Sequence, residues 1–204
     1  MDIEDVPELQ YITHMSNVPS MLQHGILSHH GTAKTGIAST SVASPIIQER
    51  RRKVRVPVPG GSRPLHSYAN LYFSARNPMM RVLLNQHADL SVLRIRKDVL
   101  HLPGVVVTDC NAASDHVRFG DSVAGLAIVD GELVFAEYWT DPDPILYYRR
   151  KSAKCAEVLV PDVVPPSFIF GAYTSTQDSL DRLRQMCALP HDFEGEVDAH
   201  LFFR

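Results

Sequence analysis

The chain contains few cysteines. Cys110, Cys155 and Cys187 are the only three, and they are widely spaced along the sequence. Such a set forms neither a disulfide framework nor a CxxC metal knuckle. The pattern indicates a reduced, cytoplasmic protein.

Long hydrophobic runs are also missing. The longest apolar stretches, such as residues 104–107, are far too short to cross a bilayer. The first residues are acidic and lack an apolar centre, which argues against a secretory signal. We therefore expect no membrane association.

Several common catalytic motifs are absent. The sequence has no GxxxxGK[ST] loop, no GxGxxG after a strand, no HExxH or Cys/His ligand spacing, and no GxSxG elbow. P-loop, dinucleotide-fold and serine-hydrolase chemistry are therefore not expected, and we predict no bound metal.

The chain does contain an alternation of short strands and short capped helices. Its 204 residues, of which 45% are hydrophobic, suit one α+β domain over residues 1–204. Strands are predicted at 11–14, 71–73, 91–96 (half-buried), 105–108, 157–160 and 167–172. Helices are predicted after Ser16 or Asn17, after Ser44, from Asn77 to about Gln86, and after Ser175 or Thr176.

The remaining segments carry turn-forming residues. Residues 28–43 and 56–70 are predicted to be loops, because they are rich in glycine, serine, threonine or proline. Residues 116–155 are expected to form short helices and loop that cross an opening.

Net charge is −3, but two clusters are strongly basic. One comprises Arg50, Arg51, Arg52, Lys53 and Arg55, and the other Arg149, Arg150, Lys151 and Lys154. Charge runs are usually solvated surface. Both clusters flank the motifs considered next, so we favour contact with a phosphate backbone.

Five local blocks recur in a recognisable order. They are YITH at 11–14, QERR at 48–51, YFSARNPM at 72–79, TDCNAA at 108–113 and AEVLV at 156–160. Together they resemble the DarT family of toxins, which move ADP-ribose from NAD onto a base of single-stranded DNA. The resemblance covers roughly residues 10–185.

The resemblance implies an ADP-ribosyltransferase fold, with a split central β-sheet and flanking short helices that form a cleft for NAD. It implies single-stranded DNA as acceptor, thymine as the expected base, and a macrodomain antitoxin as partner. It also implies that the segment before Glu157 recognises the acceptor.

Glu157 and Arg51 are the predicted catalytic pair. A carboxylate at a strand start is often a salt-bridge partner, but a fixed carboxylate also stabilises a ribosyl cation. The family's AExLV-type block maps its catalytic glutamate to Glu157, and its arginine block maps to Arg51. An arginine beside thymine favours the deprotonated base. From the sequence, Arg50 or Arg51 could face the cleft.

The remaining site residues follow the same blocks. The predicted NAD contacts are Thr13, His14, Tyr72, Phe73, Arg76 and Met79. The predicted acceptor contacts are Arg50, Asn111, His116, Arg149, Arg150 and Lys154. Most of these side chains are equally compatible with ordinary folding roles.

Other functions stay open, because base choice rests on loop details and because two departures from the family pattern are compatible with an inactive member. Gln10-Tyr11 stands where a Tyr-His pair is common, and Cys110 replaces a glycine. The alternatives are a guanine- or RNA-directed transferase, an inactive module that binds NAD or nucleic acid, and a transferase acting on protein.

Overall fold

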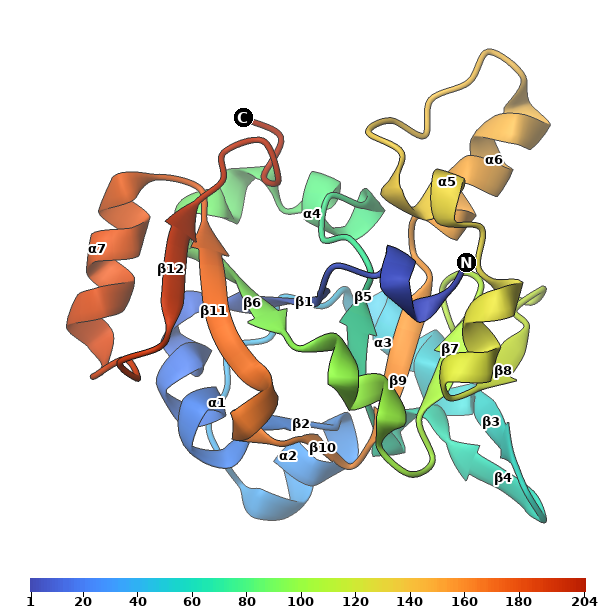
Figure 1. Ribbon diagram of the computed structural model, residues 1–204, viewed down its shortest axis with the longest axis horizontal. Coiled ribbons are helices and arrows are strands. Elements are labelled where there is room, and N and C mark those ends of the chain that lie inside the picture. Colours follow the sequence, from blue (N-terminus) through green and yellow to red (C-terminus); the bar gives the residue numbers. More distant parts are fainter.

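A computed structural model describes residues 1–204, and it is built around an eight-stranded sheet (Figure 1). The strand order is β12-β11-β6-β1-β5-β9-β7-β8. Its strands are β1 (Leu9–His14), β5 (Tyr68–Tyr72), β6 (Leu90–Ile95), β7 (Val106–Thr108), β8 (Phe119–Asp121), β9 (Glu157–Pro161), β11 (Ile169–Thr174) and β12 (Glu194–Val197). All neighbours are antiparallel except β11 and β12, which run parallel.

The sheet is split between β1 and β5. These two strands pair only at Gln10 and Tyr72, whereas β1 pairs with β6 along its whole length. The side chain of Gln10 also accepts a hydrogen bond from the Ala75 backbone (2.6 Å), which joins the halves at this end. Beyond Gln10 the strands diverge and leave an opening between the two half-sheets, as predicted for the split ADP-ribosyltransferase fold.

Seven short α-helices surround the sheet. They are α1 (Val18–His24), α2 (His29–Thr35), α3 (Pro45–Lys53), α4 (Pro78–Val82), α5 (Gly131–Phe135), α6 (Pro144–Ala153) and α7 (Gln177–Met186). Helix α7 packs on the β11–β12 edge, and α6 projects from the opposite side (Figure 1). None of the helices combines the length and the apolar character that a bilayer span requires.

Two of the four predicted helix caps make side-chain bonds, whereas Ser44 begins α3 without one. Asn77 accepts from the backbones of Met79 and Met80, with Pro78 in the first turn. Thr176 accepts from Ser179 at the start of α7. These contacts satisfy backbone donors that have no partner within the helix.

Short 3₁₀ helices and two small two-stranded sheets complete the chain. The 3₁₀ segments are Ile3–Asp5, Met15–Asn17, Leu65–Ser67, Leu84–Asp89, Lys97–His101, Val123–Ile128 and Pro166–Phe168. The small sheets pair β3 (Arg55–Val58) with β4 (Gly61–Pro64) and β2 (Ile26–Leu27) with β10 (Val163–Val164).

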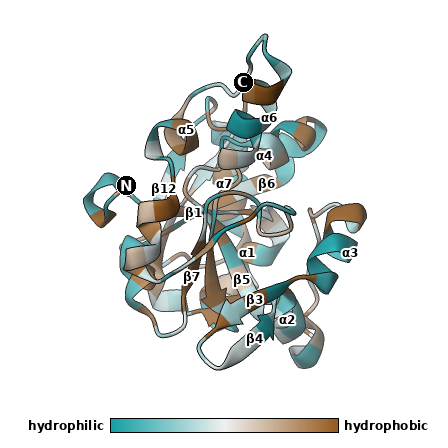
Figure 2. Ribbon diagram, turned by 90° about the vertical axis from the view of Figure 1, so that its right-hand side faces the viewer, coloured by the Kyte–Doolittle hydropathy of each residue, from teal (hydrophilic) through white to brown (hydrophobic).

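The main core lies against the central strands. Leu93, Val158 and Val107 are fully buried in one cluster of apolar side chains. The apolar strands form the brown centre of Figure 2, whereas α3 passes from brown at its start to teal at its end. Strand β6 is covered on both faces, so the predicted half-buried strand was wrong: all of its residues but Arg94 are buried.

Four other predictions need correction. Residues 28–43 include α2, which Ser28 caps, and residues 56–70 include the β3–β4 hairpin and most of β5. The predicted helix at 77–86 ends at Val82 and continues as a 3₁₀ turn. The C-terminal tail contributes strand β12, which the sequence did not predict.

Candidate active site

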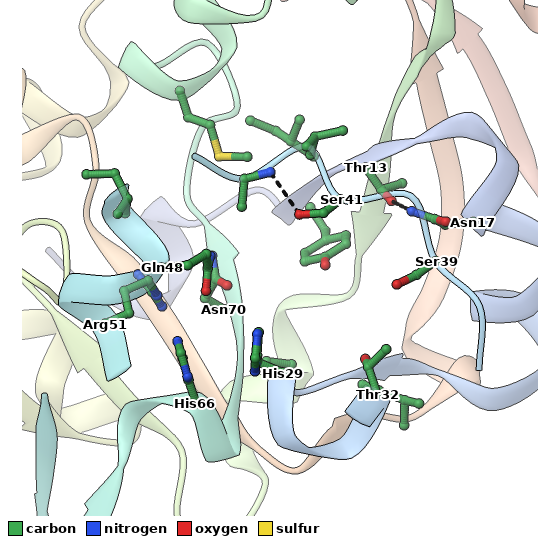
Figure 3. Close-up of a pocket in the computed structure, with 18 of the residues that line it drawn as sticks. Thr13, Asn17, His29, Thr32, Ser39, Ser41, Gln48, Arg51, His66 and Asn70 are labelled. Atoms are coloured by element: carbon green, nitrogen blue, oxygen red, sulfur yellow. Dashed lines mark hydrogen bonds between the residues drawn. The ribbon is translucent and has the colours of Figure 1, made fainter. Parts of the chain in front are cut away.

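A cavity of about 910 Å³ opens where β1 and β5 diverge (Figure 3). One wall comes from Tyr11 to Thr13 of β1, and the facing wall from β5. The loop 37–44, α2 and the inner face of α3 enclose the rest. The volume lies in the upper part of the range, roughly 300–1,000 Å³, typical of small-molecule and cofactor sites.

Arg51 and Glu157 form a buried ion pair at this cavity. Arg51 Nη1 lies 2.9 Å from Glu157 Oε1, and Nη2 lies 2.9 Å from Oε2. Arg51 is 6% exposed and lines the cavity, whereas Glu157 is fully buried behind it. Burial alone lowers the pKa of Arg51, but the facing Glu157 carboxylate outweighs that effect and raises it.

The position of Glu157 is fixed by its neighbours as well. The backbone of Ala112 donates to Oε1 (3.1 Å), and the Glu157 backbone donates to Thr108 Oγ1 (3.1 Å). Thr108 in turn donates to the Cys110 carbonyl (2.7 Å). Residues 108–113 therefore hold the Glu157 carboxylate in place at the start of β9, with little freedom to move.

Helix α3 decides which arginine faces the cavity. Successive helical residues point about 100° apart, and only Arg51 of the basic run is buried. Arg50 is exposed, while Arg52 and Lys53 pair with Glu49 on the outer face (2.8 and 3.8 Å). The structure thus answers the question that the sequence left open between Arg50 and Arg51.

Two tyrosines flank the arginine. Tyr72 lies directly across the β5–β9 ladder from Glu157 and donates to Met79 Sδ (3.2 Å). Burial and the Glu157 charge raise the pKa of Tyr72, and burial raises the pKa of Tyr11 against the opposing effect of Arg51. Both phenols therefore stay protonated at neutral pH and present neutral aromatic surface to the cavity.

The end of β1 is tied to the loop that covers the cavity. Asn17 Nδ2 donates to Thr13 Oγ1 (3.1 Å) and to the Thr40 carbonyl (2.9 Å), and its Oδ1 accepts from the Thr40 backbone (2.8 Å). Figure 3 shows Thr13 and Asn17 on this wall. Asn17 was predicted as a helix cap, but its side chain makes no capping bond. It anchors the loop 37–44 instead.

A histidine cluster lines the lower wall. The rings of His29 and His66 stack with centroids 4.2 Å apart, and His30 meets His66 edge-on at 5.7 Å. Burial, His29 and Arg51 lower the pKa of His66 to about 4. His66 is therefore neutral near pH 7, and its buried Nε2 has no hydrogen-bond partner.

The cavity carries one fixed positive charge and no lining carboxylate. Arg51 is the only lysine or arginine among its lining residues, which include no aspartate or glutamate. Hydroxyl and amide groups supply most of the other polar contacts. This composition suits a ligand that is anionic and rich in hydrogen-bond acceptors, such as a pyrophosphate flanked by sugars.

Only three of the six predicted NAD contacts line the cavity. Thr13, Tyr72 and Met79 line the cavity. His14 lies outside it and accepts from the Ser16 backbone (3.1 Å), while Phe73 is buried in the main core. Arg76 faces the opposite side of α4, where it donates to the His200 carbonyl. The last three are therefore not cavity residues in this structure.

The predicted acceptor contacts are also divided. Asn111 lines the cavity. Arg50 on α3, Arg149 on α6 and His116 are exposed. Arg150 pairs with Asp141 (3.2 Å). Lys154 was expected to meet DNA phosphate, but its ammonium is buried and donates to the Val134 and Ala136 carbonyls (both 2.8 Å). Lys154 therefore anchors the end of α6 to residues 134–136.

Cys110 causes no backbone strain where the family has glycine. The only non-glycine residues with positive φ are Ser122, Asp162 and Phe203. The side chain of Cys110 is buried, and burial raises the pKa of its thiol to about 11. The substitution is thus compatible with an intact 108–113 block.

Comparison with known proteins identifies the family. A family model described as ssDNA thymidine ADP-ribosyltransferase, DarT, matches residues 10–203. The chain belongs to the DarT family. DarT proteins are NAD-dependent DNA ADP-ribosyltransferases, and the blocks that carry the resemblance all lie within the matched region.

Curated DarT relatives are similar over most of this chain. A DNA ADP-ribosyl transferase from Thermus sp. (strain 2.9) is 32% identical over 170 residues, which cover 79% of this chain and 78% of the relative. A transferase–glycohydrolase fusion protein from Thermosipho africanus is 32% identical over 187 residues, or 87% of this chain. The match spans only 45% of that fusion protein.

Solved DarT structures share the fold. Thermosipho africanus DarTG in complex with ADP-ribose has a TM-score of 0.83 and 29% identity, and covers 96% of this chain and 51% of its own. Thermus sp. 2.9 DarT in complex with ADP-ribosylated ssDNA has a TM-score of 0.81 and 25% identity, and the match covers 97% of this chain and 96% of that one.

Most residues that line the cavity were not predicted as part of the DarT site. The polar ones include Asn17, His29, His66 and Asn70. Asn17 belongs to a helix start and Asn70 to a strand, so neither stood out. His29 and His66 are 37 positions apart in the chain, and only the fold brings their rings together.

Proposed function

We propose that this chain transfers one ADP-ribose from NAD to thymine in single-stranded DNA. The observation that carries the proposal is the two-point Arg51–Glu157 pair at the wall of a large cavity in a DarT fold. The DarT family, whose members act on thymidine in single-stranded DNA, supplies the acceptor class.

The cavity chemistry supports NAD as the donor. Arg51 provides the cation for the pyrophosphate or the acceptor, and Asn17, Thr13 and Asn70 provide amide and hydroxyl groups for the sugars. Tyr72 offers a neutral aromatic face that suits nicotinamide stacking. Thermosipho africanus DarTG binds ADP-ribose, the part of NAD that is transferred.

The reaction breaks the ribose–nicotinamide bond and forms a ribose–thymine nitrogen bond. The bonding electrons leave with neutral nicotinamide, and the thymine nitrogen loses its proton, which the net reaction releases to solvent, as it attacks. Glu157 would stabilise the positive charge that develops on the ribose. Arg51 would stabilise the negative charge on the deprotonated base.

The ion pair imposes a condition on this mechanism. Glu157 has no exposed surface, and Arg51 binds both of its carboxylate oxygens from the cavity side. Contact between Glu157 and the ribose therefore requires Arg51 to turn from the carboxylate toward the cavity. A guanidinium has five N–H donors, and Arg51 uses only two of them on Glu157, so a partial turn can keep one bond while gaining another.

A single-stranded acceptor follows from the chemistry of the base. The reacting edge of thymine is paired in a duplex, and an enzyme reaches it only in single-stranded or flipped-out DNA. The exposed arginines Arg50 and Arg149 are proposed to meet the phosphates of that strand.

We further propose that the protein acts as a toxin with a macrodomain antitoxin. The support is the Thermosipho africanus relative, which is named as a fusion of DNA ADP-ribosyl transferase and DNA ADP-ribosyl glycohydrolase. A glycohydrolase partner would remove the modification that this chain adds.

The direct test is incubation of the protein with NAD and single-stranded oligonucleotides that differ in one base. A mass increase of one ADP-ribose on DNA containing thymine is the expected result. Addition to guanine-only DNA or to RNA would change the proposed acceptor. Label on protein but on no oligonucleotide would contradict the proposal.

A further inference from the structure

A second cavity lies on the opposite side of α4 from the first. It measures about 440 Å³ and sits between α4, the loop before α6 and the C-terminal tail, which lie close together at the top of Figure 1. We call it the α4 groove. It is lined by Arg76, Arg81, Tyr138, Trp139, Thr140, His200, Phe203 and Arg204.

Helix α4 is a shared wall between the two cavities. Pro78, Met79 and Val82 line the larger cavity, while Arg76 and Arg81 line the α4 groove. A helix with its side chains is only about 10–12 Å across. A chain-like ligand with one unit in the larger cavity can therefore cross α4 and reach the groove.

The groove combines arginines with aromatic rings. The guanidinium of Arg76 lies 4.1 Å from the centroid of the Phe203 ring, and that of Arg81 lies 5.7 Å from the same centroid. Trp139 meets Phe203 edge-to-face at 5.7 Å. No aspartate or glutamate lines the groove; the nearby Glu137 lies 3.8 Å from His200 Nε2.

Arg76 is a buried cation without a carboxylate partner. It is 9% exposed and donates to the His200 carbonyl, and its Nε has no hydrogen-bond partner. Behind it lies Lys154, whose pKa is lowered to about 8 by burial and by Arg76. Buried charges are normally paired with an opposite charge; Arg76 has no such partner, so the groove favours an anionic ligand.

The ring of Phe203 is held at the groove by an unusual backbone. Phe203 has a φ of 61°, a conformation that is rare for a bulky residue. Its backbone donates to the His200 carbonyl (3.0 Å), and Arg204 donates to the Ala199 carbonyl (3.0 Å). Strained residues of this kind persist where the surrounding structure fixes them, and they cluster at binding sites.

We propose that the α4 groove binds one nucleotide of the same DNA strand, at a position flanking the base that is modified. Its aromatic rings would stack on the flanking base, and its arginines would hold the adjacent phosphate. This inference rests on the proposed function, because it assumes that the acceptor is a single strand.

The test compares binding of a long and a short oligonucleotide, measured by fluorescence anisotropy without NAD. The long strand has about 15 nucleotides, near the upper site size of single-strand binders, and the short one holds only the target base and its immediate neighbours. The variants are Trp139→Ala and Arg81→Glu. Arg184→Glu, an exposed arginine on the distant helix α7, is the matched control.

Both groove variants are expected to bind the long strand at least about fivefold more weakly than the wild type, as for loss of one stacked base. The advantage of the long strand over the short one should shrink to the same extent. Arg81→Glu should also reduce the slope of the log binding constant against log salt concentration by about one, as for loss of one phosphate contact. Arg184→Glu should match the wild type. Thermal denaturation confirms that each variant is folded.

Equal affinity of the wild type and both groove variants for the long strand would overturn the inference. That is also the result expected if the groove holds a segment of a protein partner. The outcome is separate from the proposed reaction: a wild type that binds the strand through the groove but adds no ADP-ribose would contradict the reaction alone.

Discussion

Arg51 binds both carboxylate oxygens of the fully buried Glu157, each at 2.9 Å. The proposed catalytic carboxylate is therefore neither free nor exposed before substrate binds. The ion pair holds each group in place for the other, and it must rearrange for the reaction. Structural stability and catalysis thus depend on the same two side chains.

Substitution Arg51→Ala is expected to destabilise the protein strongly. It leaves Glu157 buried without a counter-ion, which costs about 3–5 kcal/mol, or roughly 6–20 °C in Tm for a chain of this size. Its exposed neighbour Arg50 provides the matched control, since Arg50→Ala should change Tm little. Differential scanning calorimetry measures both. A Tm of Arg51→Ala equal to that of Arg50→Ala would show that the pair contributes nothing to stability.

The double variant Arg51→Met/Glu157→Leu separates stability from activity. Replacing both charges with apolar groups removes the unpaired ion, so much of the lost stability should return. ADP-ribose transfer should remain absent. If the double variant were no more stable than Arg51→Ala, the loss in the single variant would have another cause.

Asn17→Ala should weaken NAD binding more than it lowers the maximal rate. It removes two hydrogen bonds to Thr40 and one to Thr13, so the loop 37–44 loses its anchor on the cavity wall. We expect KM for NAD to rise several-fold, the effect of roughly 1 kcal/mol of lost positioning in total. Gln23→Ala, an exposed change on α1, is the control. An unchanged KM would show that the loop 37–44 does not contribute to NAD binding.

His66 should make the protein less stable in acid. Its pKa falls from 6.5 in the unfolded chain to about 4 in the folded protein, so between these values the unfolded chain binds the extra proton. Unfolding is then favoured increasingly as pH falls from 6.5 to 4. The full shift corresponds to about 3 kcal/mol, which solvent screening reduces to roughly 2 kcal/mol, and the effect is absent above pH 6.5. Denaturant titrations of wild type, His66→Gln and the exposed-histidine control His24→Gln measure it. The prediction fails if the unfolding free energy of His66→Gln falls with pH as steeply as that of the wild type.

Local features of the fold could be predicted because their causes are local. Asn77 and Thr176 cap helices where the sequence placed them. The β3–β4 hairpin was missed because Pro57, Pro59 and Pro64 suggested a loop, yet prolines are tolerated in edge strands. Helix α2 was missed because its histidines, threonines and Gly31 are weak helix formers, and its Ser28 cap has no other sequence signal.

The site itself depends on contacts that are distant in the chain. Arg51 and Glu157 are 106 residues apart, and only the placement of α3 over the split sheet joins them. Family resemblance pointed to both residues, but it could not show that Arg51 shields the carboxylate. It also placed Arg76 beside NAD, whereas the structure places that side chain in the α4 groove.

The most direct test of the account compares wild type, Glu157→Gln and Glu49→Gln in one assay. Each protein is incubated with NAD and a thymine-containing single-stranded oligonucleotide, and ADP-ribosylated DNA is followed by mass. Glu49 is the control because it is an exposed glutamate on α3, paired only with Arg52 and Lys53. The account predicts transfer by wild type and Glu49→Gln, and a rate lower by roughly 10²–10³ for a folded Glu157→Gln, the loss typical of a transition-state stabiliser. Transfer by Glu157→Gln at the wild-type rate would contradict it.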